Sequence, residues 1–357
     1  MAASALLAVV AWRLAAGLGS GASVIPATST EEKALAAATH FLDTYMDENG
    51  RVVRRDQGGS TVSEGQAYAM LLAAAIGDRD AFDRAWSWTR ANLHRSDGLL
   101  SSLWENGHVV DPNPASDADL DAAHALLIAA QRFDDDGYRS DGLRIAAAIL
   151  GSETAEVDGK PVLTAGTWAR AAPPTINPSY FDPRAYALLG AMSGDPRWDQ
   201  LESSSRELLD GLAARSPLPP DWASARTTGP VAIPAPSDPA AGVRYGFDAV
   251  RVPVRWAAAC TPENRAIAAR EWSFLGPQEA AGNLAGEYSL DGQPLSPASP
   301  AALVGAAGAA RADGHTSVSD ALLDRAESAD AATPTYYGAA WVALGRVMLN
   351  TDWLGPC

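Results

Sequence analysis

Apolar side chains recur at intervals of three and four residues along most of the chain, which is the period of an amphipathic helix. The spacing is clear at Phe181, Ala185 and Leu188. The pattern predicts twelve helices, at residues 31–47, 64–77, 78–93, 119–134, 138–151, 179–193, 196–214, 246–259, 262–275, 298–312, 315–328 and 335–350. No long alternating pattern of the kind that a β-strand needs competes with them. The sequence therefore predicts an all-α protein.

Short polar breaks such as Gly77-Asp78 divide consecutive helices into hairpins. An even number of paired helices suggests a closed ring, because each hairpin can bury its inner face only against its neighbours. The ring would be a single domain over residues 28–357, and an open helical solenoid is the alternative. The longer connections are expected to form the walls of a cleft. They fall at residues 94–118, 152–178, 215–245 and 276–297.

The composition of the chain limits which kinds of molecule it can bind. The 357 residues are 47% hydrophobic, which is ample for a large core. Lys and Arg number 27 against 43 Asp and Glu, a net charge of -16 that argues against nucleic acid or an anionic membrane as the main partner. Eleven Trp and nine Tyr against six Phe favour aromatic rings with a polar group, the kind that stacks on sugars, although core packing accounts for most of them. A neutral ligand is expected.

The N-terminus, residues 1–27, has features of an export signal. An apolar run from Ala2 to Trp12 is followed by Arg13 and a stretch of small residues, but the usual basic segment in front of the run is missing. An uncleaved membrane anchor or an upstream start would explain that, although the run is short for a membrane-spanning helix. We expect export to a secreted or extracytoplasmic location, with the membrane contacted only through this segment.

No motif indicates a metal or a cofactor. Cys260 and Cys357 are too few and too far apart for a zinc or iron–sulfur site, and they could instead form a disulfide in an oxidising compartment. The five His are scattered without metalloprotease spacing, and no P-loop or Gly-x-Ser-x-Gly pattern occurs. We expect the protein to work without a cofactor.

Glu64 stands where a predicted helix begins. Ser63 with Gln66 three residues later has a capping-box pattern, which puts Glu64 in the first turn. The simple interpretation is that Glu64 complements the helix dipole, and the other is that it is a catalytic carboxyl group. The dipole alone would lower the pKa of Glu64, so an acid catalyst here requires burial and a neighbouring negative charge that outweigh it.

A second acidic helix start follows Ser116, a plausible N-cap, and contains Asp117, Asp119 and Asp121. Capping and dipole compensation explain one of these acids easily and three less well. Asp117 is the strongest candidate for a functional role, whereas capping or solvation is favoured for Asp119 and Asp121.

The third acid, Asp248, lies among aromatic residues at another helix start. Arg251 and Arg255 follow one turn apart, so both can face the acid and lower its pKa, and a purely structural Asp–Arg pair is the alternative. Glycoside hydrolysis needs two carboxyl groups of opposite protonation across the scissile bond. Glu64, Asp117 and Asp248 could supply them if their segments converge in one groove with room for a water molecule.

Four segments resemble glycoside hydrolase family 8 and occur in the order found in that family. They are Ser-Glu-Gly-Gln-Ala-Tyr-Ala-Met at 63–70, Ala-Ser-Asp-Ala-Asp at 115–119, Asn-Pro-Ser-Tyr-Phe at 177–181 and Asp-Ala-Val-Arg-Val-Pro-Val-Arg at 248–255, and Tyr336-Tyr337 also fits. The resemblance extends over residues 30–350. It implies an (α/α)6 barrel of six helical hairpins that cleaves β-1,4-linked glycans with inversion of configuration.

The resemblance also implies roles for individual residues. Glu64 would be the proton donor, Asp248 the base that activates water, and Asp117 the residue that holds the sugar in its distorted, reactive shape. Tyr180 would position the sugar or the water, and Arg251 would orient the base. The remaining substrate-binding candidates are Trp104, Asp119, Tyr68 and Tyr336.

The chain departs from the family pattern at two places. After the second segment, Asp121-Ala122-Ala123-His124 replaces the usual run, and His124 is interpreted as a packed helix residue rather than a catalyst. Val254 stands where the family has an aromatic residue. Trp104 resembles a sugar-stacking platform, but it could equally close its loop onto the core.

The short single-domain layout resembles the cellulases associated with cellulose synthesis. The favoured substrate is therefore a cellulose-type β-1,4-glucan, and a cellulose-synthase complex is a candidate partner. Xylan, lichenan and chitosan are alternative substrates. A catalytically idle glycan-binding subunit is a second hypothesis, which the presence of all three acids disfavours, and a different (α/α)-barrel enzyme is a third.

Overall fold

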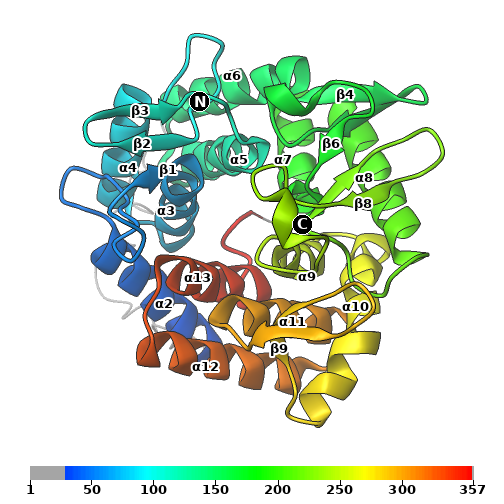
Figure 1. Cartoon of the computed structure of the whole chain (residues 1–357). Helices are drawn as coiled ribbons and strands as arrows, with labels where there is room; N and C mark the ends of the chain where they lie inside the picture. The colour runs from blue at the N-terminus through cyan, green and yellow to red at the C-terminus, as the bar shows by residue number, and fades with distance from the viewer. Residues whose placement is uncertain (1–28, 356–357) are drawn as a thin grey trace, which may run out of the picture.

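Twelve α-helices build the part of the protein that the computed structural model describes, residues 29–355 (Figure 1). They are α2 Ser29–Tyr45, α3 Ser63–Ile76, α4 Arg79–Asn92, α5 Ser116–Phe133, α6 Asp136–Ser152, α7 Pro183–Ser193, α8 Arg197–Ala213, α9 Val252–Ala257, α10 Pro262–Ala280, α11 Pro300–Ala312, α12 Thr316–Ala332 and α13 Tyr336–Asn350. The predicted helices are therefore confirmed with shifted ends, although the one predicted at 246–259 is reduced to the six residues of α9. No helix in this part combines the length and the apolar character of a membrane span.

Two predictions concern residues outside the described part. The predicted export signal or anchor covers residues 1–27, and Cys357, which could form a disulfide with Cys260, also lies outside the described part. Both stay predictions.

The helices form two concentric rings, which make a closed (α/α)6 barrel (Figure 1). Helices α3, α5, α7, α9, α11 and α13 form the inner ring, in which each contacts the next and α13 returns to contact α3. The other six pack outside on inner neighbours. Burial follows the rings, because α3, α5 and α13 are buried on nearly every side whereas α4 and α12 bury one face. Closure of the ring excludes the open solenoid.

Small residues allow close approach between two inner helices. A Cβ at Gly305 in α11 would lie 2.6 Å from the carbonyl oxygen of Val250, and Gly308 makes the same kind of contact with the first turn of α9. Val250 belongs to the 3-10 helix η4 (Ala249–Arg251), which leads into α9. Because only glycine fits at such distances, the sequence of α11 fixes the segment that follows Asp248.

Ten short strands, none longer than four residues, lie in the described connections between helices. They are β1 Thr61–Val62, β2 Leu103–Glu105, β3 His108–Asp111, β4 Thr154–Val157, β5 Lys160–Leu163, β6 Thr175–Ile176, β7 Trp222–Ser224, β8 Val231–Ile233, β9 Ala285–Tyr288 and β10 Pro294–Pro297. They form four antiparallel sheets, β1-β2-β3, β4-β5, β6-β7-β8 and β9-β10. Ile176 pairs with Ala223, so Asn177 and Asp221 leave the third sheet at the same end.

Ser63 and Ser116 are not the N-caps that the sequence predicts. The capping positions are Val62 and Ala115, and neither provides a side-chain cap. Ser116 Oγ instead donates to a loop carbonyl oxygen at 2.5 Å. Gln66, expected to complete the capping box, is buried, and its amide bonds to the loop before β1 and to α4. Each helix therefore begins at its serine, one residue earlier than a serine cap would allow. The side chains of Ser116 and Gln66 bind neighbouring segments instead of capping a helix.

Candidate active site

A cleft of about 430 Å³ opens at the N-terminal ends of inner helices α3, α11 and α13. Six of the nine predicted site residues line it: Glu64, Tyr68, Tyr180, Asp248, Arg251 and Tyr336. The loop before β1 contributes Arg54, Asp56 and Gln57, which the sequence did not single out. None of the four long connections supplies a lining residue, so the expectation that they wall this cleft is wrong. The cleft is instead walled by the short segments that lead into the inner helices.

Glu64 lies in the first turn of α3, as predicted, and Ser63 Oγ donates to its Oε2 at 3.2 Å. Burial raises the pKa of Glu64 to about 7, and the negative charge of Asp117 adds to the effect. These two causes outweigh the hydrogen bonds to the carboxylate and the charge of Arg251. The carboxyl group is therefore mostly protonated below about pH 6 and about half protonated at pH 7, which suits an acid catalyst.

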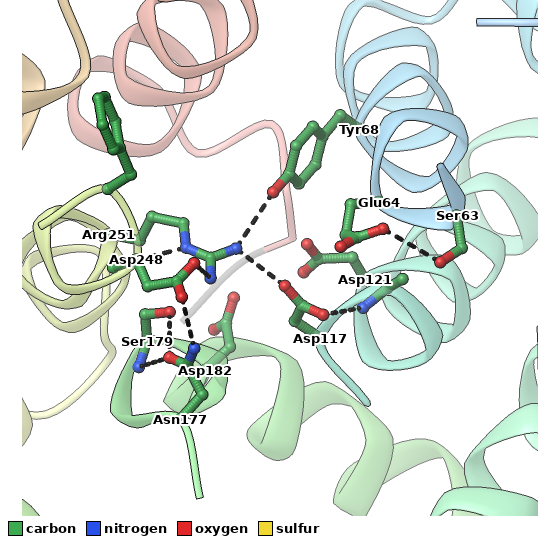
Figure 2. A network of polar contacts seen from close by, with 12 residues as sticks. Ser63, Glu64, Tyr68, Asp117, Asp121, Asn177, Ser179, Asp182, Asp248 and Arg251 are labelled. Carbon is green, nitrogen blue, oxygen red and sulfur yellow. Dashed lines mark hydrogen bonds and ion pairs between the residues drawn. The ribbon is translucent and has the colours of Figure 1, made fainter. Parts of the chain in front are cut away.

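Asp248 stands on the other side of the cleft, at the start of η4 (Figure 2). Its Oδ1 accepts a hydrogen bond from Arg251 Nη2 at 2.7 Å, and its Oδ2 accepts one from Asn177 Nδ2 at 2.9 Å. The side chain is 30% exposed, so water can reach it. Two donors on two oxygens, one of them a guanidinium, suit a carboxylate that must stay ionised.

Arg251 joins this acid to Asp117. Its Nη1 donates to Asp117 Oδ2 at 2.8 Å and to the Tyr68 hydroxyl at 3.3 Å (Figure 2). The guanidinium also lies 5.2 Å from the centre of the Tyr180 ring. Asp117 is 1% exposed, and burial raises its pKa in spite of Arg251. We call Asp117, Arg251 and Asp248 the upper layer.

A second ion cluster lies one helical turn deeper. Arg255 Nη1 and Nη2 donate to the two oxygens of Asp121 at 2.7 Å, and Nη1 also donates to Asp182 Oδ2 at 2.7 Å. Asp182 Oδ1 caps α7 by accepting from two backbone amides. We call Asp121, Arg255 and Asp182 the lower layer. The expectations that Asp121 is a capping or solvated acid and that Arg255 pairs with Asp248 are therefore wrong.

Two residues predicted to bind substrate lie away from the cleft. Asp119 is fully buried, and its Oδ1 accepts from the backbone amide of Leu100 at 2.8 Å. A position two residues after Asp117 on a helix points to nearly the opposite side, which explains the placement. Trp104 packs edge-on against Trp88 at 5.3 Å, and a guanidinium covers its ring at 4.4 Å. Its packing matches the alternative in which it closes its loop onto the core.

His124 is buried in α5, and its Nε2 lies 3.2 Å from the carbonyl oxygen of Leu354. Burial lowers its pKa. This is the packed helix residue that the sequence indicated. Within residues 29–355, no three His, Cys, Asp or Glu side chains gather in a way that could hold a metal ion.

Sequence reasoning missed two residues that contact the Asp248 segment. Asn177 was part of a family-like stretch but received no role, although its amide binds the carboxylate of Asp248. Asp221 lies in a connection rich in Pro and Ala and binds backbone amides on both sides of Asp248. The motif around Asn177 could have indicated it, whereas nothing near Asp221 in the sequence could.

The chain belongs to glycosyl hydrolases family 8, whose family model matches residues 22–350, and it is therefore a glycoside hydrolase. A probable endoglucanase from Novacetimonas hansenii is 35% identical over 246 residues, which cover 66% of this chain and 71% of that protein. An endoglucanase from Cellulomonas uda is 33% identical over 219 residues, 59% of each protein. The solved endo-beta-1,4-glucanase from Acetobacter xylinum superposes with a TM-score of 0.73 at 29% identity, over 88% of this chain and 97% of that one.

Proposed function

We propose that the protein is an endo-acting β-1,4-glucanase that hydrolyses a cellulose-type glucan with inversion of configuration. The observation that carries the proposal is the pairing, across one cleft, of Glu64 with its raised pKa and Asp248 with its guanidinium and amide donors. The reaction needs two carboxyl groups of opposite protonation, and the burial of Glu64 and the two donors on Asp248 support this assignment. The names of the relatives support glucan as the substrate class.

In the proposed reaction Glu64 gives its proton to the glycosidic oxygen as the bond to the anomeric carbon breaks. A water molecule beside Asp248 attacks that carbon from the opposite face of the ring, and Asp248 takes the proton that the water loses. Attack from the opposite face inverts the configuration. We assign to Asp117 the role of holding the distorted sugar, and its charge adds to the effect of burial in raising the pKa of Glu64.

The acid and base assignments are tested by two isosteric variants. Glu64→Gln should lower kcat by about three orders of magnitude or more, because a sugar alkoxide leaves poorly without a proton. Asp248→Asn should lower kcat to a similar extent, because the water then attacks without a base. Glu48→Gln, at an exposed position, is the matched control and should be unchanged. Retained turnover in the Glu64 variant would reject the assignment.

Stereochemistry and substrate are tested together. Proton NMR of the first cello-oligosaccharide products should show the α-anomer, and a β-anomer would overturn inversion. Reducing-end release from cellulose-type glucan should exceed that from xylan, lichenan and chitosan. Faster release from one of these three would reassign the substrate while leaving the mechanism in place.

A catalytically idle glycan-binding subunit is the alternative function. It predicts that cello-oligosaccharides bind and that long incubation releases no product. Export through the N-terminal segment and association with a cellulose-synthase complex stay proposals. Fractionation of cells that express the full chain tests the first, because purely cytosolic protein would reject export. Co-purification with the synthase tests the second.

A further inference from the structure

Asp221 holds the backbone on both sides of Asp248. Its Oδ1 accepts hydrogen bonds from the amide of Gly246 at 2.9 Å and from the amide of Ala249 at 2.8 Å. Its own backbone amide donates to the carbonyl oxygen of Arg244 at 2.9 Å. Three hydrogen bonds thus join Asp221 to the segment 244–249, which ends in the first residue of η4. The only carboxyl-bearing residue in that segment is Asp248.

The Asp221 carboxylate lies close against the backbone of Gly246. A Cβ on Gly246 would lie 2.6 Å from Asp221 Oδ2 and 3.1 Å from Glu287 Oε1. A side chain at position 246 would therefore have to displace the Asp221 carboxylate, which is held there by its two backbone donors.

The same small sheet carries a second group that acts on Asp248. Asn177 follows β6 and Asp221 precedes β7, at the same end of the paired strands. Asn177 Nδ2 binds the carboxylate of Asp248, whereas Asp221 binds the backbone around it. Trp222, the next residue after Asp221, packs edge-on against Tyr180 at 6.1 Å. The β6-β7-β8 sheet therefore fixes both the side chain and the main chain of Asp248.

We propose that Asp221 is a positioning residue for the general base: through Gly246 and Ala249 it sets the direction in which the Asp248 carboxylate meets the attacking water. The inference rests on the proposed function, because it requires Asp248 to be the base. Asp221 does not line the cleft and needs no contact with substrate. It acts on the chemical step alone, since a base displaced by a fraction of an ångström removes the proton less well while the glucan binds as before.

The ionisation of Asp221 makes a conservative test available. Burial and the charge of Asp248 raise the pKa of Asp221 to about 7. At pH 6 the group is therefore mostly a neutral acid, and an asparagine reproduces both its shape and its Oδ1 acceptor. Glutamate keeps the carboxyl group but moves it by one methylene. Asn and Glu variants thus separate the hydrogen-bond geometry from the ability to ionise.

The experiment measures kcat and KM on cello-oligosaccharides at pH 6, with thermal unfolding of each variant. Asp221→Ala and Asp221→Glu should lower kcat by about 10- to 100-fold, with KM nearly unchanged. Asp221→Asn should stay within about three-fold of the unmodified protein, since it keeps the acceptor. Asp238→Ala, an exposed aspartate in the same connection, is the matched control and should change nothing.

A leaving-group test distinguishes an effect on the base from one on the acid. A dinitrophenyl cello-oligosaccharide needs little acid catalysis, so it should restore much of the turnover of Glu64→Gln. It should not restore that of Asp221→Ala or Asp248→Asn. Restoration in the Asp221 variant, or a loss that follows the unfolding temperature or KM instead of kcat, would overturn the inference.

The outcomes also separate this inference from the proposed function. If Asp248→Asn is as active as the unmodified protein, the assignment of the base fails and the inference fails with it. If Asp248→Asn is inactive while Asp221→Ala and Asp221→Glu turn over normally, only the inference on Asp221 fails. Should the Ala variant not fold, the contrast between the Asn and Glu variants gives the same decision.

Discussion

The upper and lower layers share one design, a guanidinium between two carboxylates, but they differ in their access to water. The lower layer is sealed, because its side chains are 1–3% exposed and Arg255 donates three hydrogen bonds of 2.7 Å to the two acids. In the upper layer the Asp248 side chain is 30% exposed and faces the cleft. Access thus separates an ion cluster that ties helices together from one that can meet a substrate.

Asp182 of the lower layer and Asp117 of the upper layer also differ in the direction of their pKa shifts. Burial would raise the pKa of Asp182, but Arg255, His124 and the amides of α7 outweigh it and lower the pKa. At Asp117 burial prevails, and the pKa is raised despite Arg251. Asp182 has its donors on both oxygens, so it stays ionised. Asp117 accepts fewer hydrogen bonds than Asp182 and lies beside Glu64, the residue that must carry a proton in the proposed reaction.

Removing the arginine of the lower layer should give the largest effect on stability. Arg255→Met leaves Asp121 and Asp182 buried without their partner, which should lower the free energy of unfolding by about 3–5 kcal/mol. Chemical denaturation at pH 7 measures the change. Arg139→Met, at an exposed position, is the control and should be neutral within about 0.5 kcal/mol. An equal, small loss in both variants would contradict a structural role for the lower layer.

The equivalent change in the upper layer should act on turnover instead. Arg251→Met removes the group that orients Asp248 and pairs Asp117, so kcat should fall by about 10²-fold or more. Unfolding should be affected less than in the Arg255 variant, because only Asp117 is left buried without its partner, whereas Asp248 can be solvated from the cleft. Steady-state kinetics and denaturation on the same preparation make the comparison. If Arg251→Met were the less stable protein of the two, the division of roles would be wrong.

Glu153 extends the comparison to a buried acid that has no arginine bound to its carboxyl group. It is fully buried, neither carboxyl oxygen has a hydrogen-bond partner among the described residues, and burial raises its pKa well above the ordinary value, with Asp119 adding to the effect. When the pKa of an acid is higher in the folded protein than in the unfolded chain, its effect on stability depends on pH. Stability is intact at pH values below the unfolded-state pKa and is lost as the pH rises from there through the folded-state pKa. Glu153→Gln cannot ionise, so it should raise the free energy of unfolding at pH 8 by about 1–3 kcal/mol. At pH 4 the two proteins should be alike, and a gain of equal size at both pH values would contradict the argument.

The helices were predictable because apolar spacing is a local property, and ring closure followed from their number and pairing. The acids were predictable only in part. Asp117, Asp119 and Asp121 share one short stretch, yet the helix turns Asp119 away from the cleft and buries Asp121 one turn below it. Depth along the barrel axis depends on how α5 and α9 pack, which no local pattern contains.

Asp221 marks the limit of sequence reasoning on this chain. It meets Gly246 and Ala249 only because β7 pairs with β6 and thereby reaches the Asp248 segment. The contact spans a loop of more than twenty residues with no helical or strand period to predict its path. The predicted sugar-binding role of Trp104 failed for a related reason. Its packing against Trp88 depends on the position of a hairpin relative to α4.

The smallest effect expected is a shift in pH dependence. Glu64 must be protonated to act, and its pKa is raised to about 7, so kcat/KM should fall as pH rises through about 7. Asp117 contributes to that raised value, so Asp117→Asn should move the alkaline limb to lower pH as well as lowering kcat. The position of the limb is independent of the height of the profile, and measuring kcat/KM from pH 4 to 9 gives both. Asp238→Ala should leave the limb in place. A limb that stays put in Asp117→Asn would mean that burial alone keeps Glu64 protonated, and the upper layer would then act on the base side of the cleft only.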